Sequence, residues 1–358
     1  WVGPGTGGLV AYDTPVVFRF ADDVRGDIQR EVAGVPAVSV SLDDRVQYVR
    51  AGTVVERTVD VRVRSADVNP RDVQVSLALP QGLQADSATR TVALRGYDAQ
   101  QLVSFRVRGR LSAGQHRIVA RAVSGGETYE MGYELVDYEH IRRQRIYSPS
   151  VVQVSAVDVQ VPPALRVGYI AGVSDNVAPA LPQLGIAVTT ISAADVGSTD
   201  LSRFTTIVVG PRAYDAHPEL VPANQRLLDF ARGGGTLVVQ YGQYEMTQPG
   251  VMPFPITINR PHDRVTHESA PVTLLDASAR VLTVPNRIAG RDFDGWVQER
   301  ALYMPRTFDE RYQPVLAMND PGEAPNRGAI LVAPLGRGTY VYTSLALFRQ
   351  LPAGVPGA

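Results

Sequence analysis

The chain has 358 residues, of which 44% are hydrophobic and 20% charged, a composition typical of folded globular proteins. A single core rarely grows to this size, so two domains are expected. The formal net charge of −1 provides no bulk field for nucleic acid, and no apolar run reaches the length of a membrane span. The absence of cysteine excludes disulfides, thiolate nucleophiles and cysteine-ligated zinc.

Residues 1–34 are predicted to form a linker and an edge strand. Residues 1–12 are rich in glycine, and a short strand-like run follows at residues 14–20. The chain starts at Trp1 and stops at Ala358, directly after an apolar stretch. We therefore expect it to be part of a longer polypeptide, truncated at its C-terminus.

Residues 35–162 show the alternation of an antiparallel sheet. Val59, Val61 and Val63 alternate with polar residues, and residues 73–79, 103–107 and 129–135 repeat this pattern. Pro, Gly and Asn separate the runs, as expected of tight turns. Several short strands at this spacing predict an all-β, immunoglobulin-like sandwich.

Residues 163–358 have a different pattern, which begins after Pro162-Pro163. Apolar strands are predicted at residues 165–171, 187–191, 206–210 and 236–241. Helices are predicted between them, a short one reaching Leu184 and another over residues 224–232 that ends at Gly233. This order predicts a parallel sheet in an α/β, flavodoxin-like domain, and residues 330–343 are expected to form a terminal hairpin.

Several segments of the sequence resemble the C-terminal region of large bacterial LmbE-like (PIG-L family) deacetylases. The resemblance lies in strands and turns and not in catalytic motifs. They are residues 165–172, 207–214, 233–241, 293–300 and 348–356, together with residues 38–42 and 136–141 of the β half. The α/β half also resembles a class I glutamine-amidotransferase domain.

This resemblance implies a zinc-dependent N-acetyl sugar deacetylase as the parent protein. Its catalytic domain, with the zinc, would lie upstream of Trp1 and would be the partner of this chain, which itself would hold no cofactor. The family resemblance also implies a periplasmic or secreted location. An amidotransferase domain carries a cysteine nucleophile on a sharp turn after a central strand, and this chain has none.

The turn that matches this elbow is expected at Tyr241, Gly242 and Gln243, directly after the fourth strand. Nucleophilic catalysis needs cysteine, or serine beside a base, and this run contains neither. The interpretation is a degenerate elbow, in which Gly242 permits a tight turn without catalysis.

Two groups of residues have side chains that could bind a metal. His217 and Glu219 echo the metal motif of the family, but the aspartate pair of that motif is missing. His262, Asp263 and His267 lie within a few positions of one another, yet no helix supports their spacing and no third distant ligand can be named. Neither group is predicted to bind a metal, and the second is kept as an alternative.

A possible ligand contact is centred on Trp296, flanked by Asp292 and Asp294. An aromatic ring among polar groups can stack on a sugar, although it more often anchors a loop on the core. Residues 233–235 are all glycine, but they follow a helix and precede a strand, so they are interpreted as a helix stop and not as a phosphate-binding loop.

Taken together, the sequence predicts a non-catalytic accessory region that serves assembly or substrate positioning. Two alternatives remain open. One is a carbohydrate-binding module at Trp296, and the other is an autonomous hydrolase that uses a metal near His262 and His267. Carbohydrate is a possible partner, and an oligomer is possible.

Overall fold

The computed structural model describes residue 14, residues 16–138 and residues 140–358, so the predicted linker over residues 1–12 lies outside the described residues. Contacts divide the chain into two compact units. The first contains the described residues up to Arg45, Glu56–Gly109 and Arg117–Val152. The second contains Val46–Val55, Arg110–His116 and Gln153–Ala358. The boundary proposed at residues 162/163 stays a prediction.

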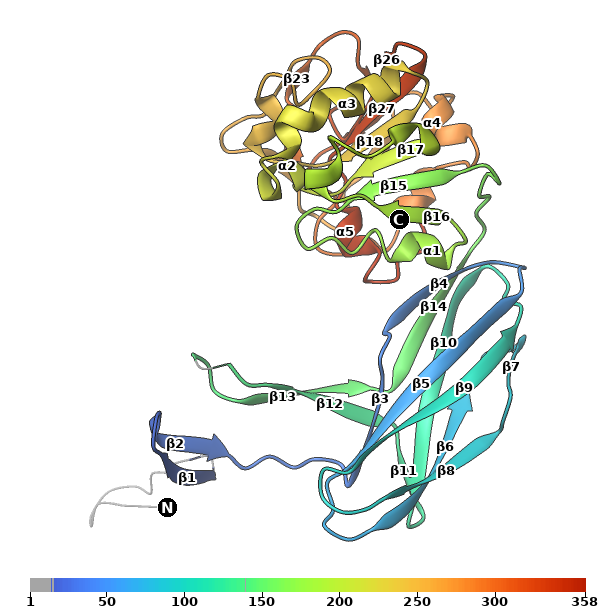
Figure 1. Ribbon diagram of the computed structural model, residues 1–358, viewed down its shortest axis with the longest axis vertical. Helices are drawn as coiled ribbons and strands as arrows, with labels where there is room; N and C mark the ends of the chain where they lie inside the picture. The colour runs from blue at the N-terminus through green and yellow to red at the C-terminus, as the bar shows by residue number, and fades with distance from the viewer. Residues whose placement is uncertain (1–13, 15, 139) are drawn as a thin grey trace. The chain divides into compact units, whose positions relative to one another are not determined.

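The β half is built from strands that pair mostly antiparallel, with β14 and β4 as a parallel pair (Figure 1). The strands are β1 (Val17–Asp22), β2 (Gly26–Glu31), β3 (Val38–Leu42), β4 (Val46–Arg50), β5 (Val55–Ser65), β6 (Arg71–Ala78), β7 (Leu83–Ala85), β8 (Thr89–Leu94), β9 (Gln100–Gly109), β10 (Gly114–Ser124), β11 (Glu127–Tyr129), β12 (Met131–Val136), β13 (Gln144–Pro149) and β14 (Val151–Val157). One sheet has the order β3-β5-β9-β7 and the other the order β4-β14-β10-β6-β8. β1 pairs with β2, and β12 with β13, as separate two-stranded ribbons.

The alternation read from the sequence decides which side chains enter the sandwich core. Val61 and Val63 on β5, and Phe105 on β9, are fully buried, whereas the polar residues between them face outward. Val73 and Val75 on β6 are buried in the same way. One face of each sheet therefore packs inward, and the predicted β-sandwich is confirmed.

The α/β half contains a mostly parallel sheet. Its strands are β15 (Arg166–Ile170), β16 (Ala187–Thr190), β17 (Thr206–Val209), β18 (Thr236–Gln240), β24 (Gln313–Pro314), β26 (Ile330–Leu335) and β27 (Gly338–Thr343). They lie in the order β16-β15-β17-β18-β27-β26-β24, and the pairs from β16 to β27 are parallel. The parallel strands follow the 2-1-3-4-5 order of a flavodoxin-like sheet. The predicted fold class, a β-sandwich followed by an α/β domain, is thus confirmed.

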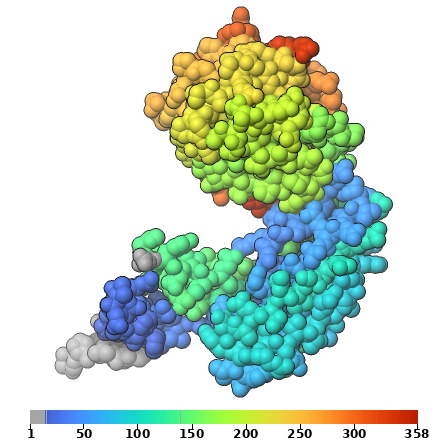
Figure 2. All heavy atoms as spheres, in the orientation of Figure 1, coloured from blue at the N-terminus to red at the C-terminus, as the bar shows by residue number. Residues whose placement is uncertain are grey.

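Different kinds of structure cover the two faces of this sheet. Leu237 and Val239 of β18, with Tyr340 and Tyr342 of β27, pack on the face that carries helix α3 (Leu220–Arg232). Val341, between the two tyrosines, points to the opposite face. That face is covered by the segment between β18 and β26, which is rich in short strands rather than helices. In the space-filling view the α/β half forms one closely packed body (Figure 2).

The segment that covers the second face contains several short elements. These are β19 (Ile256–Thr257), β20 (Asp263–Val265), β21 (Val272–Leu274), α4 (Arg280–Thr283), β22 (Ala301–Met304), β23 (Thr307–Phe308) and β25 (Leu316–Met318), followed after β27 by α5 (Leu347–Gln350). β20 pairs with β22, and the register shifts between Asp263 and Val265. Among the described residues, no helix is long and apolar enough to cross a membrane.

The helices differ from the predicted ones at their starts. α3 begins at Leu220 rather than at residue 224, because Pro222 stands in its first turn, where a missing N–H costs little. The helix expected to reach Leu184 is reduced to α1 (Ala180–Gln183), since Asp175 instead closes the loop that precedes it. α2 (Ala213–Ala216) was not predicted.

In the second unit, hydrogen bonds connect two strands to the C-terminal residues of the chain. The Tyr48 hydroxyl lies 3.0 Å from the carbonyl oxygen of Leu351 and 3.1 Å from that of Val355. The Ser155 hydroxyl donates to the carbonyl oxygen of Gly354 over 2.6 Å. Within this unit, residues of β4 and β14 therefore hold the C-terminal turn through buried polar contacts.

Candidate functional site

The carboxyl ends of the parallel strands meet at one edge of the α/β sheet. Strand order reverses between β15 and β17, which places a topological switch point at the loops that follow them. In open α/β sheets, ligands bind outside this edge. The loops after β15, β17 and β18 begin at residues 171, 210 and 241, so these residues define where a site is expected.

Asp175 organises the loops at the switch point. Its carboxylate accepts a hydrogen bond from the hydroxyl of Tyr169, which lies 2.9 Å from both oxygens, and others from the amides of Gly172 and Val177. The Tyr169 hydroxyl in turn accepts a hydrogen bond from Gln240 Nε2 at 2.9 Å. One polar network therefore joins the ends of β15 and β18.

The two glycines of these loops allow a very close approach of backbone. A Cβ atom at Gly172 would lie 1.9 Å from the carbonyl oxygen of Pro211. A Cβ atom at Gly210 would lie 2.1 Å from an Asp175 carboxylate oxygen. Larger residues at either position would separate the loops, so the switch point depends on both glycines.

The predicted degenerate elbow lies directly after β18. Tyr241 is 6% exposed, and its carbonyl oxygen accepts a hydrogen bond from the Arg212 amide at 2.7 Å. A Cβ atom at Gly242 would lie 2.5 Å from the sulfur of Met246. The Gln243 amide donates to the Glu245 carboxylate over 2.7 Å. The turn is closed by packing and local hydrogen bonds, and its side chains include no nucleophile of the serine or cysteine type.

Aromatic rings gather around Tyr241. We call Tyr241, Tyr244, His262, Tyr303 and Phe348 the aromatic cluster. The Tyr241 ring packs between those of Tyr303 and Phe348, with centroids 6.3 and 5.4 Å away. His262 stacks on Tyr303 at 3.7 Å with an interplanar angle of 6°, and Tyr244 meets Tyr303 edge-on at 5.5 Å. Apart from Tyr241, the rings of the cluster are half-buried.

Charged side chains surround the aromatic cluster. Arg212 pairs with Asp215, and Arg349 pairs with Glu299. The Arg260 guanidinium lies over the Tyr244 ring, 3.7 Å from its centroid. Such contacts hold planar guanidinium groups beside aromatic faces.

Burial shifts the pKa of three ionisable groups of the cluster, raising those of Tyr241 and Tyr303 and lowering that of His262. Burial raises the pKa of Tyr241, which keeps its hydroxyl protonated at neutral pH. Burial, followed by the nearby charge of Arg264, lowers the pKa of His262 and favours its neutral imidazole. Tyr241, Tyr303 and His262 therefore present uncharged rings at neutral pH.

Backbone strain is concentrated near this edge. Among the described residues, the non-glycine residues with positive φ include Ser174 at +48°, Arg212 at +56° and Tyr303 at +48°. Ser174 follows β15, Arg212 follows β17 and Tyr303 belongs to the aromatic cluster. For bulky side chains this conformation is uncommon, and such strain tends to occur where a site is built.

The structure separates the residues weighed as metal ligands. His262 stacks on Tyr303, while Asp263 accepts hydrogen bonds from Asn259 and from Asn326. The His267 ring lies 3.1 Å from the Ser269 hydroxyl. Across the part of the chain that the structure describes, no group of three or more histidine, aspartate or glutamate side chains is placed to hold a metal.

His217 lies apart from these residues, at the end of α2. Its Nδ1 atom is 3.7 Å from a Glu219 carboxylate oxygen, and both side chains are well exposed. The structure thus brings this pair together without further ligands beside it, within the described residues.

Trp296 is 3% exposed and lies in the core of the segment that covers the second face. Its Nε1–H donates to the carbonyl oxygen of Asp292 over 2.9 Å, and its ring packs against Phe293. The Asp292 carboxylate accepts from the Ala289 amide, and Asp294 is exposed near Arg300. The indole anchors a loop and has no open face for a sugar ring.

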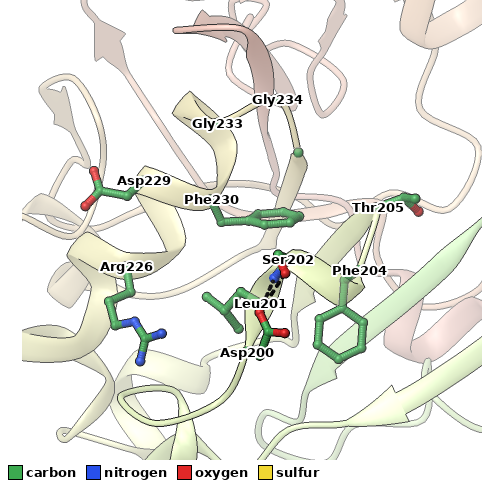
Figure 3. A pocket seen from close by; sticks show the side chains of 11 residues that line it. Asp200, Leu201, Ser202, Phe204, Thr205, Arg226, Asp229, Phe230, Gly233 and Gly234 are labelled. Carbon is green, nitrogen blue, oxygen red and sulfur yellow. Dashed lines mark hydrogen bonds between the residues drawn. The ribbon is translucent and has the colours of Figure 1, made fainter.

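A pocket of 630 Å³ lies at the opposite, amino edge of the sheet, before β17 and β18 (Figure 3). Gly233, Gly234 and Gly235 line it, with the Phe230 ring close to Gly235. The Asp200 carboxylate in this pocket accepts hydrogen bonds from Ser202, which Figure 3 marks with dashed lines. Arg226 donates to the Thr199 carbonyl oxygen. Asp200 and Arg226 thus bond to neighbouring protein groups. We therefore place the candidate site at the carboxyl edge and not in this pocket.

Reasoning from the sequence found Tyr241 and missed its neighbours. Tyr303 carried no motif, and Arg212 had no signal for its left-handed backbone. Asp175 follows the first parallel strand, at an expected switch point, and that position was a usable signal.

No protein-family model matches the chain, and no curated protein matches it significantly. Solved structures similar to it include the cold-adapted β-galactosidase from Rahnella sp. R3, with 16% identity and a TM-score of 0.32 over 53% of this chain and 30% of that chain. The β-galactosidase from Bacillus circulans sp. alkalophilus has 13% identity and a TM-score of 0.31 over 54% and 30%. The exo-β-1,4-mannosidase Op5Man5 from Opitutaceae bacterium strain TAV5 has 11% identity and a TM-score of 0.32 over 53% and 33%. The chain spans about a third or less of these chains, and this distant structural likeness assigns it to no family.

Proposed function

We propose that this chain is a non-catalytic accessory region of a zinc-dependent PIG-L/LmbE-type N-acetyl sugar deacetylase, and that it serves assembly or substrate positioning. The link to deacetylases rests on the phrases at residues 165–172, 207–214 and 233–241, which resemble that family. The α/β half would be a catalytically silent relative of class I amidotransferases.

The observation that carries the non-catalytic assignment is the chemistry of the turn after β18. A nucleophile at this position would need a low pKa or an adjacent base. The turn instead offers Tyr241, whose raised pKa keeps it protonated, and Gln243, whose amide is not a nucleophile. His262 is the histidine of the aromatic cluster, and it stacks on Tyr303 rather than facing a serine.

Zinc chemistry would belong to the upstream catalytic domain. The described residues of this chain do not fit a zinc site, because the three candidates near residue 262 contact separate partners.

An assay of the purified chain tests the proposal. With added zinc and N-acetylated sugars, the chain alone should show no deacetylation, and with glutamine it should release no ammonia. Deacetylation that is abolished by His217→Ala would overturn the accessory role. Glutaminase activity that survives Tyr241→Ala and Gln243→Ala would reveal a catalytic site elsewhere and overturn it equally.

A further inference from the structure

The aromatic cluster presents ring faces and edges beside hydroxyl groups. His262, Tyr244 and Tyr303 are half-buried, so each ring is fixed by neighbours and still reaches the surface. Stacking at 3.7 Å fixes the plane of His262 on Tyr303. Rings held in this way lose little conformational entropy when a ligand packs on them.

Two of the three guanidinium groups around the cluster are compensated locally by carboxylates. Arg212 and Arg349 are each paired with a carboxylate, and Arg260 is stacked on Tyr244. The Glu245 carboxylate accepts a hydrogen bond from the Gln243 amide. A ligand with a full negative charge would have to compete with these carboxylates for Arg212 and Arg349. A neutral ligand with many hydroxyl groups can use both the donors and the acceptors.

The same edge holds buried polar atoms whose hydrogen-bonding capacity is unused. Gln240 is 3% exposed, and its Oε1 atom has no hydrogen-bond partner within the described chain. The Arg212 Nε atom is likewise buried without a partner there. Arg212 also has a left-handed backbone, so the edge combines strain with unsatisfied polar groups.

We propose that the aromatic cluster at the carboxyl edge of the α/β sheet, together with Arg212 and Arg260, binds a neutral saccharide. Apolar faces of pyranose rings would pack on His262 and Tyr244, and hydroxyl groups would bond to Tyr303 and the guanidinium groups. This inference deepens the proposed function by naming a ligand class, and it rests on that function only for the link to N-acetylated substrates. The position differs from Trp296, which is buried.

Calorimetric titration of the whole chain tests the site. The probes are chitotriose, which is neutral and N-acetylated, cellotriose, which is neutral and lacks the acetamido groups, and AMP, which is anionic and has a flat ring. We expect saturable binding of chitotriose at millimolar or lower concentration. His262→Ala should weaken it about tenfold, because it removes the outermost ring of the stack. Tyr303→Phe should weaken it roughly threefold to tenfold, because it keeps the ring and removes one hydroxyl.

Tyr97→Ala is the matched control, since Tyr97 is 69% exposed and belongs to the other compact unit of the chain. This variant should bind chitotriose as the unmodified chain does, and thermal unfolding should show that all variants are folded. Should His262→Phe, which restores an apolar ring, recover more affinity than His262→Ala, the stacking role is supported.

Three results would overturn the inference: no binding of either trisaccharide, tighter binding of AMP than of both, or unchanged binding in His262→Ala and Tyr303→Phe. Equal binding of cellotriose and chitotriose supports the saccharide site and counts against the deacetylase link. The two proposals therefore fail separately.

Discussion

Removal of the Asp175 carboxylate is the sharpest test of how the carboxyl edge is held together. Tyr169 is fully buried, and its hydroxyl lies 2.9 Å from both carboxylate oxygens of Asp175. Asp175→Ala leaves that hydroxyl proton without its acceptor. It also deprives the amides of Gly172 and Val177 of their partner, and Val177 is only 6% exposed.

The expected loss of stability follows from these contacts. A buried donor left unsatisfied costs about 1–3 kcal/mol, and each lost amide bond adds about 1 kcal/mol where water cannot replace the carboxylate. The Gly172 amide is only half-buried and regains part of its loss from water. We therefore expect Asp175→Ala to lower the free energy of unfolding by about 3–4 kcal/mol. Tyr169→Phe should lower it by about 1–2 kcal/mol, because it leaves Gln240 Nε2 without its acceptor.

Urea denaturation of both single variants and the double variant measures these values and their coupling. Because the two residues share one hydrogen bond, the double variant should lose about 1–2 kcal/mol less than the sum of the single losses. Asp200→Ala is the control, since Asp200 bonds Ser202 in an exposed turn and should cost about 0.5–1 kcal/mol. A loss below about 0.5 kcal/mol for Asp175→Ala, or strict additivity with Tyr169→Phe, would refute the network.

Three further outcomes are expected. Trp296→Ala should lower the free energy of unfolding by about 3–5 kcal/mol in urea denaturation, because removal of a 3% exposed indole leaves a cavity. Saccharide affinity of the folded variant should not change. Unchanged stability would contradict this expectation. Because burial lowers the pKa of His262 below 6.5, the unfolded chain takes up a proton first as the pH falls, so stability should be lost from pH 6.5 downward, and less so in His262→Phe. An NMR titration that places this pKa above 6.5 would reverse the sign. Limited proteolysis should cut between residues 140 and 165 and leave two stable fragments. Asn286→Ala should speed this cleavage, since the Asn286 side chain donates one hydrogen bond to the backbone of Gln160 and accepts another from it. A chain that resists cleavage would contradict the domain boundary.

The fold was predictable because burial imposes a period on each half. Val59, Val61 and Val63 are at most 4% exposed, as their alternation with polar residues required. The apolar run Ile207–Val208–Val209 forms β17, where both faces of the sheet are covered. Such patterns can be recognised within a few consecutive residues, without knowledge of which distant segments they contact.

The segment between β18 and β26 was less predictable, because its strands are very short and pair across long stretches of chain. The register of β20 and β22 shifts between Asp263 and Val265, and no sequence pattern predicts this shift. That pairing places His262 on Tyr303. The aromatic cluster therefore depends on tertiary contacts, whereas Tyr241 could be located because it follows a recognisable parallel strand.

The turn after β18 shows why the backbone geometry of a turn says little about catalysis. Gly242 is required because a Cβ atom would collide with Met246, and Tyr241 is required to fill the space between Tyr303 and Phe348. Both demands come from packing, and they would persist with or without a nucleophile. What decides the chemistry is the atom presented at the turn. Here that atom is a phenol hydroxyl kept protonated by burial, which makes it a poor nucleophile at neutral pH.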